Sequence, residues 1–336
     1  MSLKQLAQHL DLSVSTVSRA LNGYADISEE TRERTLRAAK ALGYSPNTLA
    51  KRLAEGRTGT VAVVLTPPFD EFIPPMFLAY LQGIDEALQS RGMDTLVTMG
   101  EEPPDDLLAF RRLVEGKRVD GFIFGRTSKS DRRIRYLLKE RVPFVTIGQS
   151  PGRWVFPFVD VDRYWAALKA VRLLTGLGHQ RIALVNTGGQ FVFSQRARGG
   201  YSDALAEAGL PLSERYVIDA GFTDTSGYAA ALRILSEEPP PTAFVGGNDL
   251  LAIGCMRALR AQGLVPGRDA AVVSCEDNQP ARLVDPPLTA LSAPAVEIGR
   301  LAVDLLIRAM AGEAPEHLQH IVHPELVERG THCKRS

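Results

Sequence analysis

The sequence of 336 residues predicts a small all-α helix-turn-helix head followed by an α/β body of two doubly wound parallel-sheet lobes. Residues 1–46 contain three short stretches with apolar residues at helical spacing. From Thr60 onward, short apolar strands alternate with amphipathic helices, which is typical of parallel sheets covered by helices on both faces. These units are too numerous for one compact sheet, and they fall into two similar groups on either side of about residue 160.

The head is predicted to hold three helices. The first carries apolar residues at Leu3, Leu6, Ala7 and Leu10. Ser13 is a suitable N-cap for a second helix over residues 14–21. A third helix begins at Ser28 and ends at Gly43, before Pro46. Two helices joined by a tight turn and braced by a third form a helix-turn-helix, whose second helix enters the major groove of DNA. On periodicity alone, any small three-helix bundle explains the same pattern.

The outward face of the second predicted helix carries small or hydroxyl-bearing side chains and one guanidinium. Such groups can approach phosphates and base edges. They are Val14, Ser15, Thr16, Ser18 and Arg19. The formal net charge of the chain is zero, yet residues 1–58 hold nine Lys and Arg against six Asp and Glu. This weak asymmetry fits a DNA-facing head on an acidic body.

Residues 47–54 have the pattern of a helix cap followed by about two helical turns, which is too short to persist alone in water. Such a helix can form when it packs against DNA and against a twin from a second subunit. Residues 55–59 form a linker. The alternative is that the whole segment is a flexible connection between head and body.

Residue identity narrows these alternatives. Residues 6–22 resemble the head of the LacI/GalR family of transcription regulators, and Thr16-Val17-Ser18-Arg19 is the most specific part. One departure is Asp11, which replaces a glycine that is usual in the turn, and aspartate tolerates the left-handed conformation. The resemblance covers nearly the whole chain. Its further motifs are Leu42-Gly43-Tyr44-Ser45-Pro46-Asn47, Leu177-Gly178-His179-Gln180-Arg181-Ile182-Ala183, Gly246-Gly247-Asn248-Asp249-Leu250-Leu251-Ala252-Ile253-Gly254 and Asp285-Pro286-Pro287-Leu288-Thr289.

The resemblance implies roles for the head residues. The residues that would read bases are Val14, Ser15 and Arg19. Those that would hold phosphates are Thr16, Ser18 and Asn22. In this family the hinge helix lies in the minor groove, where a leucine wedges a base step apart. Leu53 matches that leucine, Ala50 matches the small residue that lets two hinges approach, and Asn47 is the cap.

The resemblance also implies a body of the periplasmic-binding-protein type, in which the chain crosses between the lobes three times. It divides the chain into a DNA-binding domain over 1–46, a hinge and linker over 47–59, and an effector-binding and dimerisation domain over 60–336. The first lobe is expected at about 60–161 and 292–320, and the second at about 162–291 and 321–330.

The effector site is expected at the carboxyl ends of the strands. By resemblance, its contacts are Asp162, Asn248 and Glu276 from the second lobe, supported by Asp277 or Asp249. The first-lobe contacts are Phe69, Phe77 and Arg126. Carboxylates and amides next to aromatic faces suit a ligand with many hydroxyl groups.

Two departures from the family affect this site. Glu276 stands where the family usually has aspartate, so its carboxylate reaches one methylene further. A ligand-binding arginine is expected three residues before Gly200-Tyr201, where this chain has Ala197. We expect Arg196 to replace it, with Arg198 as the alternative.

The implied function is that of a sequence-specific DNA-binding transcription regulator, a repressor of carbohydrate-utilisation genes. It acts as a homodimer on a near-palindromic operator and responds to a small sugar bound between the lobes. Residues 125–127 and 131–134 also resemble α-glucoside regulators. The alternatives are a purine or nucleoside effector in the same architecture, or a cytoplasmic sugar sensor that does not act through DNA.

Other classes of protein are not expected. The sequence contains no GxGxxG, GxxxxGK[ST], HExxH or GxSxG motif, so neither an enzyme nor a bound cofactor is predicted. The three cysteines lack CxxC spacing, and His317, His320 and His323 alternate faces on a predicted strand, so no metal is predicted. No apolar stretch has the length of a membrane helix or a secretory signal, which predicts a cytoplasmic protein.

Overall fold

The computed structural model describes residues 2–21, 23–44, 57–66, 75–101 and 105–334. The chain divides into two compact units, Met1–Thr58 and Gly59–Ser336. Each unit is described by itself below. In the described ranges, no helix combines the length and the apolar character that crossing a membrane requires.

The first unit is the three-helix head that the sequence predicts. Its helices are α1 (Leu3–Leu10), α2 (Val14–Leu21) and α3 (Glu29–Ala41). They pack around a small core whose buried members are Leu6, Ala7, Leu10, Val17 and Ala39. Asp11 adopts a φ of 54°, so it takes the left-handed conformation at the end of α1 that the sequence analysis allowed for.

Side-chain caps fix where the second and third helices of the head begin. The Ser13 hydroxyl accepts a hydrogen bond from the Thr16 backbone N–H at 3.0 Å, one turn into α2. Ser28 accepts from Thr31 N–H at 3.3 Å at the start of α3. Both are N-cap contacts to the third residue of a helix, as predicted for these two serines.

The first lobe of the body is built on a six-stranded parallel sheet with the strand order β11-β5-β4-β3-β1-β2. Its strands are β1 (Thr60–Leu65), β2 (Asp94–Met99), β3 (Gly121–Gly125), β4 (Phe144–Ile147), β5 (Phe158–Val161) and β11 (Gln319–Val322). Its helices are α5 (Pro75–Gln89), α6 (Leu108–Glu115), α7 (Arg132–Glu140) and α13 (Ala295–Met310), with a 3₁₀ turn at Pro315–His317.

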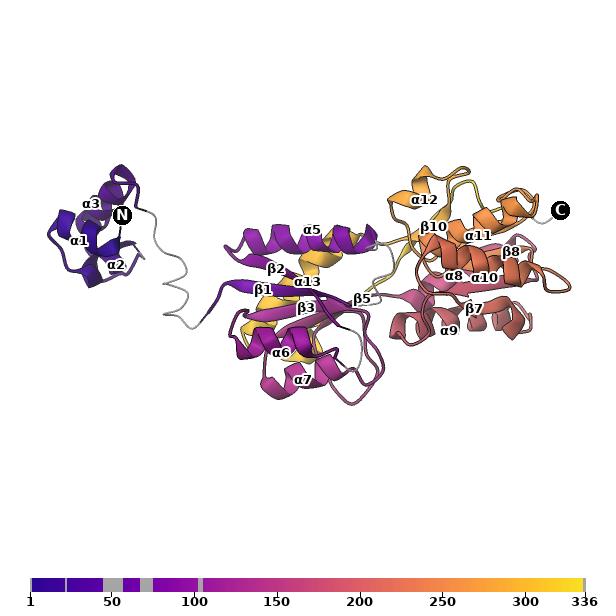
Figure 1. Cartoon of the computed structure of the whole chain (residues 1–336), viewed down its shortest axis with the longest axis horizontal. Helices are drawn as coiled ribbons and strands as arrows, with labels where there is room; N and C mark the ends of the chain where they lie inside the picture. Colours follow the sequence, from indigo (N-terminus) through magenta and orange to yellow (C-terminus); the bar gives the residue numbers. More distant parts are fainter. Residues whose placement is uncertain (1, 22, 45–56, 67–74, 102–104, 335–336) are drawn as a thin grey trace. The chain divides into compact units, whose positions relative to one another are not determined.

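Helices cover both faces of this sheet (Figure 1). The helices α5 and α13 pack together on one face, over a core that includes Val63, Ile84 and Leu306. The helices α6 and α7 lie on the other face, over Phe110, Phe122 and other aromatic side chains. Because both faces are covered, the central strands are apolar nearly throughout rather than alternating.

The second lobe repeats this plan with the strand order β12-β10-β9-β8-β6-β7, in which only β12 is antiparallel to its neighbour. Its strands are β6 (Ile182–Asn186), β7 (Val217–Asp219), β8 (Ala243–Gly246), β9 (Ala271–Ser274), β10 (Thr289–Ser292) and β12 (Glu325–Val327). Its helices are α8 (Arg163–Gly176), α9 (Val192–Glu207), α10 (Asp224–Leu235), α11 (Asp249–Ala261) and α12 (Gln279–Leu283), with a 3₁₀ turn at Glu214–Tyr216.

The chain crosses between the lobes three times, as the resemblance implied, but two of the expected boundaries need correction. Ser292 still belongs to β10 of the second lobe, so the second crossing lies after it. The expected boundary at 320–321 falls inside β11 of the first lobe, and the third crossing lies between Val322 and Glu325. The single strand predicted around residues 320–326 is therefore two short strands in different sheets.

The alternation of strands and helices that the sequence predicts is present in both lobes. The helical pattern of the sequence covers residues 168–177 and 201–208, whereas the helices α8 and α9 begin earlier, at Arg163 and Val192. In α9 the polar and glycine residues of 194–200 hide the helical pattern, because this part packs by close backbone approach rather than by large apolar side chains.

Glycine lets the helices of each pair approach closely. A Cβ added at Gly200 of α9 would lie 2.0 Å from the Tyr164 carbonyl oxygen of α8. One added at Gly299 of α13 would lie 2.2 Å from the Tyr80 carbonyl oxygen of α5. Between α10 and α11, a Cβ at Gly254 lies 2.4 Å from the Asp224 carbonyl oxygen. No side chain fits at these crossings without a backbone shift.

We predict that Gly200→Ala lowers the free energy of unfolding by about 1–3 kcal/mol, because α8 and α9 must move apart. Gly176→Ala is the matched control, since its Cβ at the end of α8 has no neighbour within 4 Å. This control should leave stability unchanged or raise it by about 0.4–1 kcal/mol. Urea unfolding of both variants measures the difference, and equal stabilities would contradict the packing described here.

Candidate functional site

The helix α2 of the head separates its buried and outward residues in the way that the sequence predicts. Val17 and Ala20 are buried, whereas Ser15 and Arg19 are exposed. Val14 is 44% exposed although it is apolar, so its side chain is available for contact with another molecule. Thr16 and Ser18 are partly buried on the same helix.

Arg19 is held at the end of α2 by two contacts within the head. Its guanidinium forms an ion pair with Asp26 and lies 5.4 Å from the centroid of the Tyr24 ring. Both partners of the ion pair are about half exposed, so the pair contributes little to stability and a phosphate or base can displace Asp26. Four predicted DNA contacts lie outside the described residues: Asn22, Asn47, Ala50 and Leu53.

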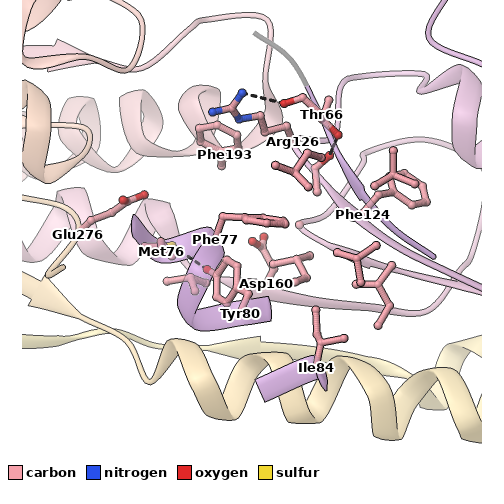
Figure 2. Close-up of a pocket in the computed structure, with 18 of the residues that line it drawn as sticks. Thr66, Met76, Phe77, Tyr80, Ile84, Phe124, Arg126, Asp160, Phe193 and Glu276 are labelled. Carbon is pink, nitrogen blue, oxygen red and sulfur yellow. Dashed lines mark hydrogen bonds between the residues drawn. The ribbon is translucent and has the colours of Figure 1, made fainter. Parts of the chain in front are cut away.

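The body contains a cavity of about 170 Å³ that is lined by residues of both lobes (Figure 2). Its polar lining residues follow strand ends, as expected for parallel sheets. They are Thr66 after β1, Arg126 after β3, Asp160 at the end of β5, Arg163 after β5, Asn248 after β8 and Glu276 after β9. Its aromatic lining residues are Phe77, Tyr80, Phe124, Phe193 and Phe222.

Arg126 connects the two lobes at this cavity. Its Nη1 donates to the Thr66 carbonyl oxygen at 2.8 Å, and the guanidinium lies 4.2 Å from the centroid of the Phe222 ring in the second lobe. Next to it, the Val192 N–H of the second lobe donates to the Thr127 carbonyl oxygen of the first lobe at 3.0 Å. Cation–π attraction of this kind contributes on the order of 1 kcal/mol. The lobes therefore meet in a weak, reversible contact.

Three phenylalanines of the second lobe form the aromatic surface beneath Arg126. Phe191 and Phe193 stack with ring centroids 5.4 Å apart, and Phe222 lies 5.8 Å from Phe191 and 6.3 Å from Phe193. Phe193 and Phe222 line the cavity. An aromatic surface of this size can cover the apolar face of a ring-shaped ligand.

Glu276, which is partly buried, forms an ion pair with the buried Arg163 at the cavity. The distance from Arg163 Nη2 to Glu276 Oε1 is 2.5 Å, and Arg163 Nη1 also donates to the Cys275 carbonyl oxygen at 2.8 Å. The second Glu276 oxygen accepts a 3.3 Å hydrogen bond from Asn278 Nδ2. Each oxygen of the carboxylate therefore accepts one hydrogen bond within the protein.

Two acidic side chains near the cavity have strongly shifted pKa values. Burial raises the pKa of Asp160 to about 6, although Gln149 Nε2 donates to its carboxylate at 2.8 Å. Burial and the neighbouring Glu276 charge raise the pKa of Asp249 to about 7. Asp249 Oδ2 has no hydrogen-bond partner among the described residues. Asp249 therefore titrates close to neutral pH, whereas Asp160 becomes protonated mainly below about pH 6.

The structure brings four of the predicted effector residues together at the cavity. Phe77, Arg126, Asn248 and Glu276 line it. Asn248 also caps α11 by accepting from Leu251 N–H at 2.8 Å. Phe69 lies outside the described residues.

Asp162 and Arg196 differ from the expectation. They pair with each other, with Arg196 Nη2 2.9 Å from Asp162 Oδ1, and neither lines the cavity. Asp162 is instead the N-cap of α8 and accepts from Trp165 N–H. Arg198, the alternative to Arg196, pairs with Glu214 at the surface.

Sequence reasoning missed Arg163, Asp160, Phe193 and Phe222 as cavity residues. Asp160 and Arg163 were missed because the strand β5 was not predicted. This strand has only four residues, and one of them is aspartate. With β5 placed, Asp160 and Arg163 fall at a strand end, where ligand-facing residues are expected.

We predict that Asp160→Asn stabilises the body more at pH 8 than at pH 5. The folded-state pKa of about 6 exceeds the unfolded value of about 3.9, so the folded protein keeps a proton that the unfolded chain has lost. The stability of the wild type therefore falls as the pH rises through this range. The advantage of the variant should grow by about 1.4 kcal/mol between pH 5 and pH 8, as measured by urea unfolding.

Asp105→Asn, at an exposed position in front of α6, is the control for this measurement. It should change stability equally at the two pH values. The raised pKa of Asp160 is refuted if Asp160→Asn also shows no dependence on pH.

Two family comparisons match separate parts of the chain. Residues 2–47 match the bacterial regulatory proteins of the lacI family, and residues 171–332 match the periplasmic binding protein-like domain. These ranges correspond to the head and to most of the second lobe with the C-terminal segment. The fold class predicted from the sequence is confirmed.

Full-length relatives extend the similarity over nearly the whole chain. The HTH-type transcriptional regulator AglR of Rhizobium meliloti (strain 1021) is 36% identical over 98% of this chain and 94% of its own length. The HTH-type transcriptional regulator RafR of Escherichia coli is 33% identical over 95% of both chains. Both are transcription regulators rather than enzymes.

Solved structures show the same architecture. The transcriptional regulator CelR–cellobiose complex has a TM-score of 0.77 and 30% identity, and the match covers 98% of this chain and 99% of that one. The Lac repressor dimer bound to operator and an anti-inducer has a TM-score of 0.85 at 24% identity and shares the fold. With a matching head, a matching body and this degree of identity along its length, the protein belongs to the lacI family of bacterial regulatory proteins.

Proposed function

We propose that this lacI-family regulator represses carbohydrate-utilisation genes. A small sugar, bound in the cavity of the body, controls its affinity for operator DNA. One observation carries the proposal. The same chain holds a helix-turn-helix with an open recognition face and a two-lobed body whose cavity draws residues from both lobes. A ligand that contacts both lobes favours one arrangement of them over others.

A sugar is the effector class that the lining supports best. Hydrogen-bonding groups from Glu276, Asn248 and Thr66 lie beside the aromatic side chains Phe77 and Phe193. Sugars combine hydroxyl groups with an apolar ring face, so they match both kinds of surface. The solved relative CelR carries cellobiose, which supports this assignment.

A purine or nucleoside is the second candidate, because the stacked rings of Phe191 and Phe193 suit any flat ring. The relatives are regulators and not enzymes, so we propose a ligand-controlled switch without catalysis. We further propose that it acts as a homodimer on a near-palindromic operator. As a regulator of chromosomal genes, it acts in the cytoplasm.

The DNA-binding part of the proposal is tested on the full chain with a duplex selected from a random library. We expect an enriched, near-palindromic sequence and steeply salt-dependent binding. Failure to enrich any sequence would contradict the proposal.

Arg19→Met should then weaken binding to the selected duplex by about 5- to 150-fold, because an arginine that contacts a base accounts for roughly 1–3 kcal/mol. Arg37→Met on α3 is the matched control, since Arg37 is exposed and pairs only loosely with Glu33. It removes the same charge from the head without touching α2. Equal losses in the two variants would show that α2 does not read DNA.

The effector part is tested by thermal unfolding of the full chain with glucose, maltose, cellobiose, sucrose, adenosine and hypoxanthine. We expect a rise in the unfolding temperature with at least one saccharide, since a ligand that binds only the folded state stabilises it. A shift with adenosine or hypoxanthine alone would replace the sugar by a purine. No shift with any of the saccharides contradicts the sugar assignment.

A further inference from the structure

Arg163 is a buried arginine at the cavity, and the sequence analysis assigned it no role. It is the first residue of α8, directly after the crossing from β5 into the second lobe, and its side chain is only 9% exposed. It lines the cavity together with Glu276. Its Nη2 also lies 3.5 Å from the Met76 sulfur, at the start of α5 in the first lobe.

The hydrogen bonds of Arg163 leave part of its donor capacity unused. An arginine has five N–H donors. Three are taken by the Cys275 carbonyl oxygen, Glu276 Oε1 and the Met76 sulfur. Two N–H donors of this cavity-lining residue remain without a hydrogen bond in the described structure. Glu276 likewise retains lone pairs beyond its hydrogen bonds from Arg163 and Asn278. The ion pair thus offers a donor and an acceptor side by side.

Both guanidinium groups that line the cavity are engaged by groups of the protein. The Arg163 guanidinium is paired with the Glu276 carboxylate, and Arg126 is engaged by the Phe222 ring and a backbone carbonyl. An anionic ligand would have to compete with Glu276 for Arg163. This competition would leave the partly buried Glu276 carboxylate without its cationic partner. A neutral ligand with adjacent donor and acceptor groups adds to the pair without breaking it.

The two other arginines expected at this place are paired elsewhere. Arg196 pairs with Asp162 and Arg198 with Glu214, and Ala197 between them is buried without a polar group. Among the described residues that line the cavity, Arg163 is the second-lobe residue with a guanidinium.

We propose that Arg163 is a ligand-contacting, specificity-determining residue, and that with Glu276 it recognises two adjacent hydroxyl groups of a neutral saccharide. Arg163 donates to one hydroxyl oxygen, and Glu276 accepts from the neighbouring hydroxyl. The inference rests on the proposed sugar effector and names the chemistry by which that sugar is chosen. Because Arg163 also contacts Met76, the bound sugar lies next to a contact between the lobes.

Isothermal titration calorimetry of the full chain tests this, with the saccharide among glucose, maltose, cellobiose and sucrose that stabilises the wild type most. Arg163→Met should bind it about 10- to 100-fold more weakly, as for the loss of a hydrogen bond from a charged donor. Arg172→Met is the matched control on the same helix, where Arg172 is exposed and pairs with Glu207. It should bind like the wild type.

A second set of titrations separates ligand recognition from a merely structural role. Each monodeoxy derivative of that saccharide is measured with the wild type and with Arg163→Met. One derivative should bind the wild type about 10- to 100-fold more weakly and yet lose little further in the variant. If the affinity of every derivative falls by the same factor in both proteins, Arg163 supports the site without contacting the sugar. The proposal is then wrong.

Arg163→Met leaves Glu276 buried without its partner, so the variant can lose its fold. The double variant Arg163→Met/Glu276→Gln removes both charges, and Arg163→Lys keeps a donor. Unfolding temperature and binding to the selected duplex confirm that each variant is folded. Wild-type sugar affinity in a folded Arg163→Met or double variant overturns this inference alone. Wild-type protein that binds its duplex and none of the four saccharides overturns the sugar effector and this inference together.

Discussion

The junction between the two lobes has to bury polar and charged groups, and the structure depends on how these groups are paired there. Parallel strands end at one edge of each sheet, and both edges contribute side chains to one cavity. Buried charges are tolerated only when they are paired or neutralised. Arg163 and Glu276 satisfy this by pairing. The Asp160 carboxyl group accepts a hydrogen bond from Gln149, and burial raises its pKa to about 6. These polar groups at the junction are also those that can recognise a ligand.

Each lobe has its own hydrophobic cores, and the contacts between the lobes described above are a cation–π contact and single hydrogen bonds. Such an arrangement lets the lobes change their relative position without unfolding. The chain enters the body at Gly59, whose N–H donates to the Asp120 carboxylate at 2.7 Å and whose φ of 66° requires glycine. This anchors the start of β1 to the first lobe.

The fold could be predicted from the sequence because its signals are local and repeated. Helix caps at Ser13 and Ser28 and apolar strands such as β1 show themselves in a few consecutive residues. The site was harder to predict, because it depends on which side chains converge across two sheets. The family resemblance predicts Asp162 as a ligand contact. In the structure, Asp162 caps the helix α8 and pairs with Arg196. Arg163, one residue further, faces the cavity, and only the placement of the short strand β5 reveals this.

In the proposed function, sugar binding in the body and operator binding by the head share one free energy of coupling. The most direct measurement is the operator affinity of the full chain with and without saturating sugar, paired with the sugar affinity with and without saturating operator. Linkage requires that both ratios be the same factor, about 5- to 150-fold for typical coupling energies. Sugar that binds the cavity while leaving the operator affinity unchanged would contradict the account.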